Sequence, residues 1–193
     1  PMVDFNVTSS DGDESVSSKT ITVDLSAVSA KNISVNYAVS GTATWSGIDY
    51  TLSDGTLNIS AGATSATINI GSIVDDSIDE SNETVVLTLS SPSNATLGSD
   101  NIHTYTINDN EDTPIIDFNT INSSGNESVS SKTITVDLSG PSSEIVTVDY
   151  AVSGSATGSV IDYSLISGTL SIAAGNTTGT ITIANIVDDT TDE

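Results

Sequence analysis

The chain has 193 residues and a formal net charge of −23, with lysines only at Lys19, Lys31 and Lys132 and no cysteine. Such a negative chain is repelled by nucleic acid and by anionic membrane surfaces, so we expect no nucleic-acid partner and no direct membrane insertion. The lack of cysteine excludes disulfides and thiolate zinc sites. Hydrophobic residues make up only 36% of the chain, but their regular pattern indicates a folded protein with a thin core of Val, Ile and Leu.

Apolar residues alternate with polar ones along the chain, which predicts strands with one buried and one solvated face. In chain order, the apolar positions are Ile21, Val23 and Leu25; Ile33, Val35, Tyr37 and Val39; Leu57 and Ile59; Ile68 and Ile70; and Val85, Leu87 and Leu89. Turns are predicted at Ser10-Asp11-Gly12, Asp54-Gly55 and Ala61-Gly62. About seven short strands in a segment of this length favour an all-β sandwich.

The sequence repeats itself at a constant offset of 113 positions. The segment Glu14–Ser26, ESVSSKTITVDLS, returns unchanged as Glu127–Ser139. A period this long makes each copy a domain, and we expect one over residues 1–112 and another over 113–193. The second copy has no counterpart of residues 81–112, which hold the strand-like segments Thr84–Ser90 and Ile102–Ile107. It should therefore lack its last two strands, which residues further along the polypeptide or strands from an identical chain would supply.

Acidic residues gather beside the predicted strands. Residues 75–83 read DDSIDESNE, residues 109–112 read DNED, Asp49 stands alone, and Glu14 is expected to open an early strand. Antiparallel topology can bring such strand ends to one pole of a sandwich, where crowded carboxylates would favour a divalent cation. Calcium prefers oxygen ligands, and zinc is disfavoured because His103 is the only histidine. The alternative is that acidic loops merely keep the protein soluble, since the spacing is not that of an EF-hand.

A longer pattern resembles the Calx-β domain family. It comprises Ala43-Thr44-x-x-Gly47-Ile48-Asp49-Tyr50, Gly55-Thr56-Leu57, Ala61-Gly62, Ile73-Val74-Asp75-Asp76 with Glu80 and Glu83, and Thr106-Ile107-Asn108-Asp109. The resemblance covers the first copy and all that is present of the second. It implies tandem immunoglobulin-like antiparallel β-sandwiches, the second incomplete, with Ca²⁺ bound by loops at one end.

The same resemblance implies a set of calcium ligands. In the first copy they are Glu14, Asp49, Asp75, Asp76, Glu80, Glu83, Asp109 and Glu111, and we add Asp112, which adjoins Glu111 between the copies. In the second copy they are Glu127, Asp162, Asp188, Asp189 and Glu193. Asn110 departs from the all-aspartate run that the family's strongest calcium sensors have at this point.

These observations predict a non-enzymatic protein. Paired carboxylates can hydrolyse glycosides, but here they recur in both copies and few aromatics accompany them. We expect a calcium-binding structural repeat of an extracellular or cell-surface adhesin, matrix or filament protein, with calcium rigidifying the junctions between modules. Its partners would be neighbouring repeats of the same polypeptide, or identical chains through strand addition. The alternative is a calcium-sensing regulatory module attached to a transporter or an enzyme.

Overall fold

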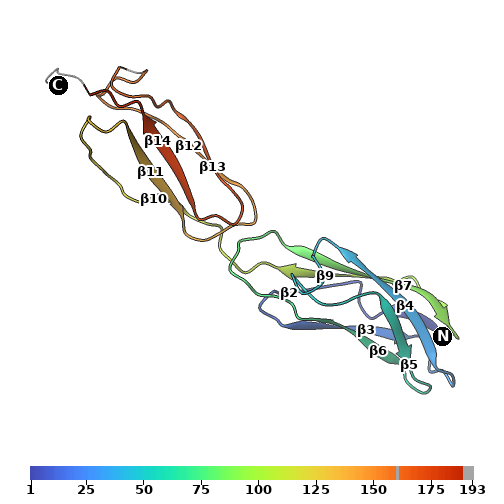
Figure 1. The fold of residues 1–193 in the computed structure, drawn as a ribbon. Helices are drawn as coiled ribbons and strands as arrows, with labels where there is room; N and C mark the ends of the chain where they lie inside the picture. The colour runs from blue at the N-terminus through green and yellow to red at the C-terminus, as the bar shows by residue number, and fades with distance from the viewer. Residues whose placement is uncertain (160, 189–193) are drawn as a thin grey trace. The chain divides into compact units, whose positions relative to one another are not determined.

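The computed structural model describes residues 1–159 and 161–188, and it divides into two compact units. The first contains Pro1–Asp76 and Ser81–Asn110, and the second contains Ser77–Glu80 and the chain from Glu111 onward. Each unit is built of strands (Figure 1). No helix among the described residues has the length and apolar character needed to cross a membrane.

The first unit is a sandwich of two sheets. One sheet has the strand order β6-β3-β1-β8 and the other has the order β2-β9-β7-β4-β5. The strands are β1 (Met2–Phe5), β2 (Ser9–Asp13), β3 (Ser18–Leu25), β4 (Ile33–Gly41), β5 (Gly55–Ile59), β6 (Ser65–Gly71), β7 (Glu83–Ser93), β8 (Thr96–Leu97) and β9 (Ile102–Asn108). Most neighbours are antiparallel, but β1 pairs with β8 and β2 pairs with β9 in parallel.

The alternation predicted from the sequence is confirmed in the core of this sandwich. On β3, Ile21, Val23 and Leu25 are buried while the residues between them are partly exposed. The same holds for Val85 and Leu87 on β7. Because side chains on a strand alternate between its two faces, each sheet contributes one apolar face, and these two faces form a single core.

Residues 9–13 differ from the prediction. The Ser10-Asp11-Gly12 segment was expected to be a turn, but it lies within β2, which pairs with β9 from Ser9–Thr104 to Asp13–Asn108. Gly12 is needed there for close packing, because a Cβ at this position would lie 2.6 Å from the Tyr105 hydroxyl. Glu14 was expected to open a strand. Instead it directly follows the end of β2.

The second unit repeats part of this architecture. Its strands are β10 (Ile116–Phe118), β11 (Ser131–Leu138), β12 (Val146–Tyr150), β13 (Gly168–Ile172) and β14 (Thr178–Ala184). They form the sheets β10-β11-β14 and β12-β13, which correspond to β1-β3-β6 and β4-β5 of the first unit. Pairing is conserved at the 113-residue offset, since Ile21 lies opposite Ile68 and Ile134 lies opposite Ile181.

The core of the second unit is thinner, because it has no counterparts of β7 and β9 among the described residues. Phe5 is 2% exposed and its ring packs 5.5 Å from the ring of His103 on β9, whereas the equivalent Phe118 is 54% exposed. A groove of about 330 Å³ opens beside Phe118, Val148 and Tyr150. The five strands described in the second unit correspond to β1, β3, β4, β5 and β6 of the first unit.

Candidate metal centre

Three carboxylates converge at one end of the β2-β9 pair. Because these strands run in parallel, their ends coincide, and the amide of Glu14 donates to the carbonyl of Asn108 at 3.0 Å. Glu14 therefore leaves the sheet beside Asp109, and Glu111 follows two residues later. One carboxylate oxygen from each of Glu14, Asp109 and Glu111 lies within 4.8 Å of the other two. Among the described residues, this is the one group of three such side chains at that spacing.

The three carboxylates have little access to water. Glu14 is 7% exposed, and Asp109 and Glu111 are partly buried. Asp109 Oδ1 and Glu111 Oε2 are both fully buried and accept no hydrogen bond from any described residue. Two full charges 4.8 Å apart repel by about 3.5 kcal/mol at an effective dielectric constant of about 20. A cation at this point would remove the repulsion and provide the buried oxygens with a partner.

Asparagine side chains hold the residues around this group. Asn82 Oδ1 accepts from the amide of Asp109 at 3.1 Å, and Asn82 Nδ2 donates to Asn108 Oδ1 at 3.2 Å. Asn110 Nδ2 donates to Asp75 Oδ1 at 2.9 Å, which ties Asp75 to the chain between Asp109 and Glu111. Neither Asn82 nor Asn108 was predicted to take part in the site. The available signals were their position among the acidic residues and the place of Asn108 in the family pattern.

Asp49, another predicted ligand, takes part in closing a loop. Its carboxylate accepts from the amide of Thr44, and its own amide donates to the carbonyl of Thr44 at 3.0 Å, so it closes the loop between β4 and β5. Its carbonyl accepts from the amide of Val74 at 3.0 Å, which places this loop beside the segment that leads into Asp75. Burial raises the pKa of Tyr50, and the negative charges of Asp49 and Asp54 raise it further.

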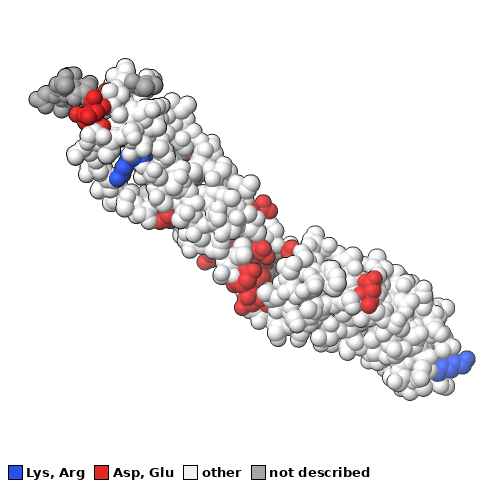
Figure 2. Space-filling view, viewed as in Figure 1, with Lys and Arg blue, Asp and Glu red and all other residues white. Residues whose placement is uncertain are grey.

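The remaining predicted ligands of the first copy lie outside the group of three. Glu83 opens β7 opposite Ile107, two residues before Asp109, so it lies at the same end of the sheet. Asp75, Asp76 and Asp112 are exposed, and Glu80 is partly buried in the Ser77–Glu80 segment of the second unit. The acidic side chains visible in Figure 2 gather in a few groups on a surface that is otherwise largely uncharged.

The second copy retains the loop closure, but its described residues hold no equivalent of the carboxylate group. The carboxylate of Asp162 accepts from the amide of Thr157, and its carbonyl accepts from the amide of Val187 at 2.9 Å, as at Asp49. Glu127 and Asp188 are exposed, and no group of three acidic side chains forms among the described residues of this copy. The predicted ligands Asp189 and Glu193 lie outside the described residues.

Comparison with solved structures finds the same tandem architecture. The crystal structure of CBD12 from CALX1.2 matches at 18% identity and a TM-score of 0.54, over 99% of this chain and 77% of that chain. The calcium binding domain CBD12 of CALX1.1 matches at 23% identity and a TM-score of 0.54, over 96% of this chain and 76% of that chain. The apo-form Calx CBD1 domain matches at 26% identity and a TM-score of 0.50, over 56% of this chain and 96% of that chain.

Comparison of sequences agrees with this result. A search of curated proteins finds no match. A family model of the Calx-beta domain, however, matches residues 1–111 and again residues 109–193, which together span the whole chain. The chain therefore belongs to the Calx-beta domain family and carries two copies of its domain.

Proposed function

We propose that this protein binds calcium through Glu14, Asp109 and Glu111 and serves as a non-catalytic structural repeat of an extracellular or cell-surface adhesin, matrix or filament protein. The observation that carries the proposal is the convergence of these three carboxylates, two of which present buried oxygens without a hydrogen-bond donor among the described residues. Asp75 lies outside this group but is hydrogen-bonded to Asn110, which stands between Asp109 and Glu111 in the sequence.

The donor set suits calcium better than other common metals. Calcium takes six to eight oxygens in flexible geometry, so carboxylates, backbone carbonyls and water can together complete its shell. Magnesium retains more of its own water. Zinc favours nitrogen and sulfur ligands, and the only histidine, His103, is buried and hydrogen-bonded to Ser10 Oγ at 2.9 Å and to the Val7 carbonyl at 2.7 Å.

A structural role is supported by the close similarity of the two copies. The same strand pairs, the same loop closure and a long unchanged segment occur at a constant offset. Glu111 lies in the short stretch that connects the copies in sequence, and a bound cation would restrict that stretch. Glu14, Asp109 and Glu111 are thereby accounted for as metal ligands, and we assign them no catalytic step.

A second candidate is a calcium-sensing regulatory module of a transporter or an enzyme, which the likeness to the CALX tandem domains favours. The two candidates differ in what surrounds the module. A structural repeat would occur in a long array of similar copies on the cell surface, where protease added to intact cells would digest it. Two isolated copies encoded beside a transmembrane transporter would support the regulatory candidate and contradict the structural one.

Calorimetric titration with calcium, together with thermal unfolding in calcium and in chelator, tests the binding proposal. A ligand that binds only the folded state stabilises it by about 2.7 kcal/mol at one hundred times its dissociation constant. The variant Asp109→Asn with Glu111→Gln should abolish both the binding heat and the stabilisation. Glu144→Gln removes one charge from an exposed side chain elsewhere and should change neither. An unchanged midpoint together with no binding heat in the unmodified chain would contradict the proposal.

A further inference from the structure

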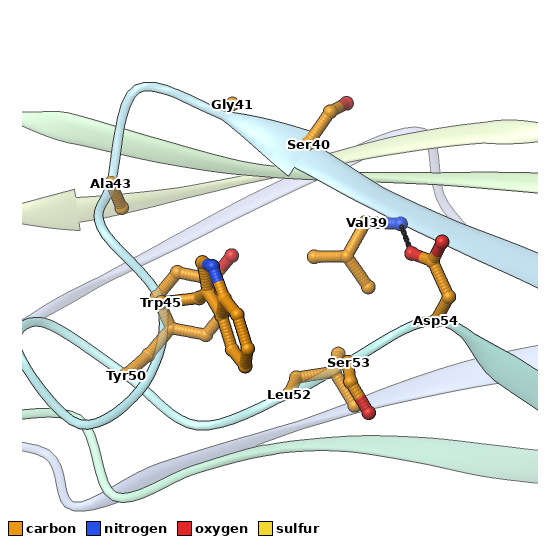
Figure 3. Close-up of a pocket in the computed structure, with 9 residues that line it drawn as sticks. All are labelled: Val39, Ser40, Gly41, Ala43, Trp45, Tyr50, Leu52, Ser53 and Asp54. Carbon is orange, nitrogen blue, oxygen red and sulfur yellow. Dashed lines mark hydrogen bonds between the residues drawn. The ribbon is translucent and has the colours of Figure 1, made fainter.

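A pocket of about 460 Å³ lies beside the end of β4 and the loop that leads into β5. Its floor contains Val39 and Leu52. Figure 3 shows the ring of Trp45 next to Tyr50 on one side and the carboxylate of Asp54 on the opposite side. Trp45 is the only tryptophan in the chain, and its side chain is 61% exposed. The volume is in the range of pockets that bind small molecules or single side chains.

The second copy shows which parts of this pocket belong to the fold. The counterparts of Val39, Tyr50 and Leu52 are the identical residues Val152, Tyr163 and Leu165. By contrast, Trp45, Ser53 and Asp54 are replaced by Gly158, Ile166 and Ser167. The framework is thus common to both copies, while the indole ring of Trp45 and the charge of Asp54 occur in the first copy alone.

These additional groups are not needed to build the loop. Asp54 Oδ1 accepts from the amide of Val39 at 2.7 Å, and in the second copy Ser167 Oγ accepts from the amide of Val152 at 2.9 Å. A hydroxyl group is sufficient for this hydrogen bond, so the bond does not require the negative charge of Asp54. Gly158 likewise occupies the position equivalent to Trp45. In both copies the loop is closed by a threonine amide that donates to an aspartate carboxylate.

The chemistry of these groups selects a cation. The face of an indole ring attracts cations, and arginine is the side chain found there most often. A guanidinium group is flat enough to stack on the ring and can donate two hydrogen bonds to one carboxylate. Asp54 is the one charged residue among those that line the pocket, and none of them is basic. A neutral sugar could also stack on Trp45 and donate hydroxyl hydrogen bonds to Asp54, but it carries no positive charge to balance that of the carboxylate.

We propose that the Trp45 pocket binds an arginine side chain of a partner protein, stacked on the indole ring and paired with the Asp54 carboxylate. The 193 residues contain no arginine, so the side chain comes from outside them. The pocket belongs to the first unit and shares no residue with the carboxylate group of Glu14, Asp109 and Glu111. The binding of arginine is therefore independent of the calcium proposal.

The single tryptophan makes the test direct, because its fluorescence reports on this pocket alone. The chain is titrated with Nα-acetyl-arginine amide in saturating calcium and at constant ionic strength. The expected result is a saturable change in emission with a dissociation constant of roughly 1 mM, typical of a single weakly held side chain. Nα-acetyl-citrulline amide has the same shape without the charge and should give no saturable change.

Variants taken from the second copy provide matched controls. Asp54→Ser keeps a hydroxyl for the Val39 amide and should weaken arginine binding about tenfold, which corresponds to about 1.4 kcal/mol. Glu144→Gln should leave the affinity unchanged. Trp45→Gly, followed by saturation-transfer NMR on the ligand, should abolish binding and offers a second test if Asp54→Ser unfolds. Equal binding of citrulline amide, saturable binding of methyl α-glucoside in place of arginine, or full affinity in both pocket variants would overturn the proposal.

Discussion

The side-chain amide of Asn110 donates a hydrogen bond to the carboxylate of Asp75 at 2.9 Å. An aspartate at position 110 could not do this at neutral pH, because an ionised carboxylate only accepts hydrogen bonds. The asparagine that departs from the family's acidic run is thus the donor that holds Asp75 beside Asp109 and Glu111.

Asn110→Asp should therefore lower stability in the absence of calcium and increase the stabilisation that calcium provides. Without calcium, the variant loses the bond to Asp75 and places two charges together, so we expect it to be about 1–2 kcal/mol less stable. In saturating calcium the added oxygen can join the metal, and the stabilisation by calcium should be larger than in the unmodified chain. Urea denaturation in chelator and in calcium measures both quantities. A smaller calcium stabilisation in the variant would contradict this role for Asn110.

Gly12 and Tyr105 form a pair that a double-mutant cycle can test. Gly12→Ala places a methyl group 2.6 Å from the Tyr105 hydroxyl and should cost about 1–3 kcal/mol. Tyr105→Phe removes that hydroxyl and leaves the nearest ring carbon at an ordinary 3.6 Å, so the alanine should be tolerated in this background.

Gly55 offers a contrasting pair for the same experiment. A Cβ at Gly55 would lie 2.6 Å from the Tyr37 hydroxyl, but also 2.8 Å from the ring carbon that bears it. Tyr37→Phe should therefore fail to rescue Gly55→Ala. Rescue at Gly55 would show that the ring carbon of Tyr37 does not exclude alanine there. Failure of Tyr105→Phe to rescue Gly12→Ala would show that the Tyr105 hydroxyl is not what excludes alanine at position 12.

Alkaline pH should destabilise the first unit through its buried tyrosines. Burial raises the pKa of Tyr105 above the ordinary value of 10.0, and the charges of Asp11 and Asp13 add to this effect. The unfolded chain therefore loses this proton first, and the free energy of unfolding falls as the pH rises above about 10 towards the folded-state pKa. Tyr50, whose pKa is also raised by burial, contributes in the same direction.

The variant Tyr105→Phe should make this pH dependence shallower. It should also raise stability at pH 7 by up to about 1 kcal/mol, because the Tyr105 hydroxyl is buried and has no hydrogen-bond partner among the described residues. Denaturation at pH 7, 9, 10 and 11 gives both values. An unchanged slope above pH 10 would mean that another group is responsible.

The sequence predicted most of the fold because strand alternation is a local property. Val85 and Leu87 could be assigned to a buried face from spacing alone, and the 113-residue offset identified the equivalent pairs in both copies. The parallel pairing of β2 with β9 could not be predicted in this way. It depends on a contact between residues 9–13 and 104–108, and the polar Ser-Asp-Gly composition indicates a turn when it is considered alone.

The candidate site was predictable in its composition but not in its geometry. Family resemblance pointed to Glu14, Asp109 and Glu111 together with many other acids, and only the β2-β9 pairing shows why these three meet. Asp49 illustrates the difference. Its place in the motif predicts a metal ligand, and the sequence alone could not show that its carboxylate also closes a loop through the amide of Thr44.

Gly41 and Gly154 are equivalent residues with different surroundings. Both have positive φ angles, 130° and 151°, so alanine is strained at either position. A Cβ at Gly41 would in addition collide with the carbonyl of Thr84 on β7, while at Gly154 nothing lies within 4 Å. Gly41→Ala should therefore cost at least about 2 kcal/mol more than Gly154→Ala in chemical denaturation followed separately for each unit. Equal costs would indicate that a strand equivalent to β7 already covers the second copy.

A strand supplied in trans should bind the groove of the second unit. Among the described residues β12 pairs only with β13, whereas its counterpart β4 pairs with both β5 and β7. A peptide with the sequence of Glu83–Ser93 should protect the amides of β12 from hydrogen exchange, with its leucines placed against Tyr150 and Val152 as Leu89 and Leu87 lie opposite Tyr37 and Val39. The same peptide with both leucines changed to serine is the control. The control peptide should give no protection. Absence of protection by the unmodified peptide would argue against strand addition from an identical chain.

The loop between β4 and β5 closes in the same way whether it carries Trp45 or Gly158, because its shape depends on the bond from threonine to aspartate. A position that tolerates both the largest and the smallest side chain is free to vary under selection. Successive copies of such a domain can therefore diversify what they present to their surroundings without any compensating change in the framework. In this respect the loop resembles the hypervariable positions of other sandwich folds, where recognition evolves on a scaffold that does not need to adapt.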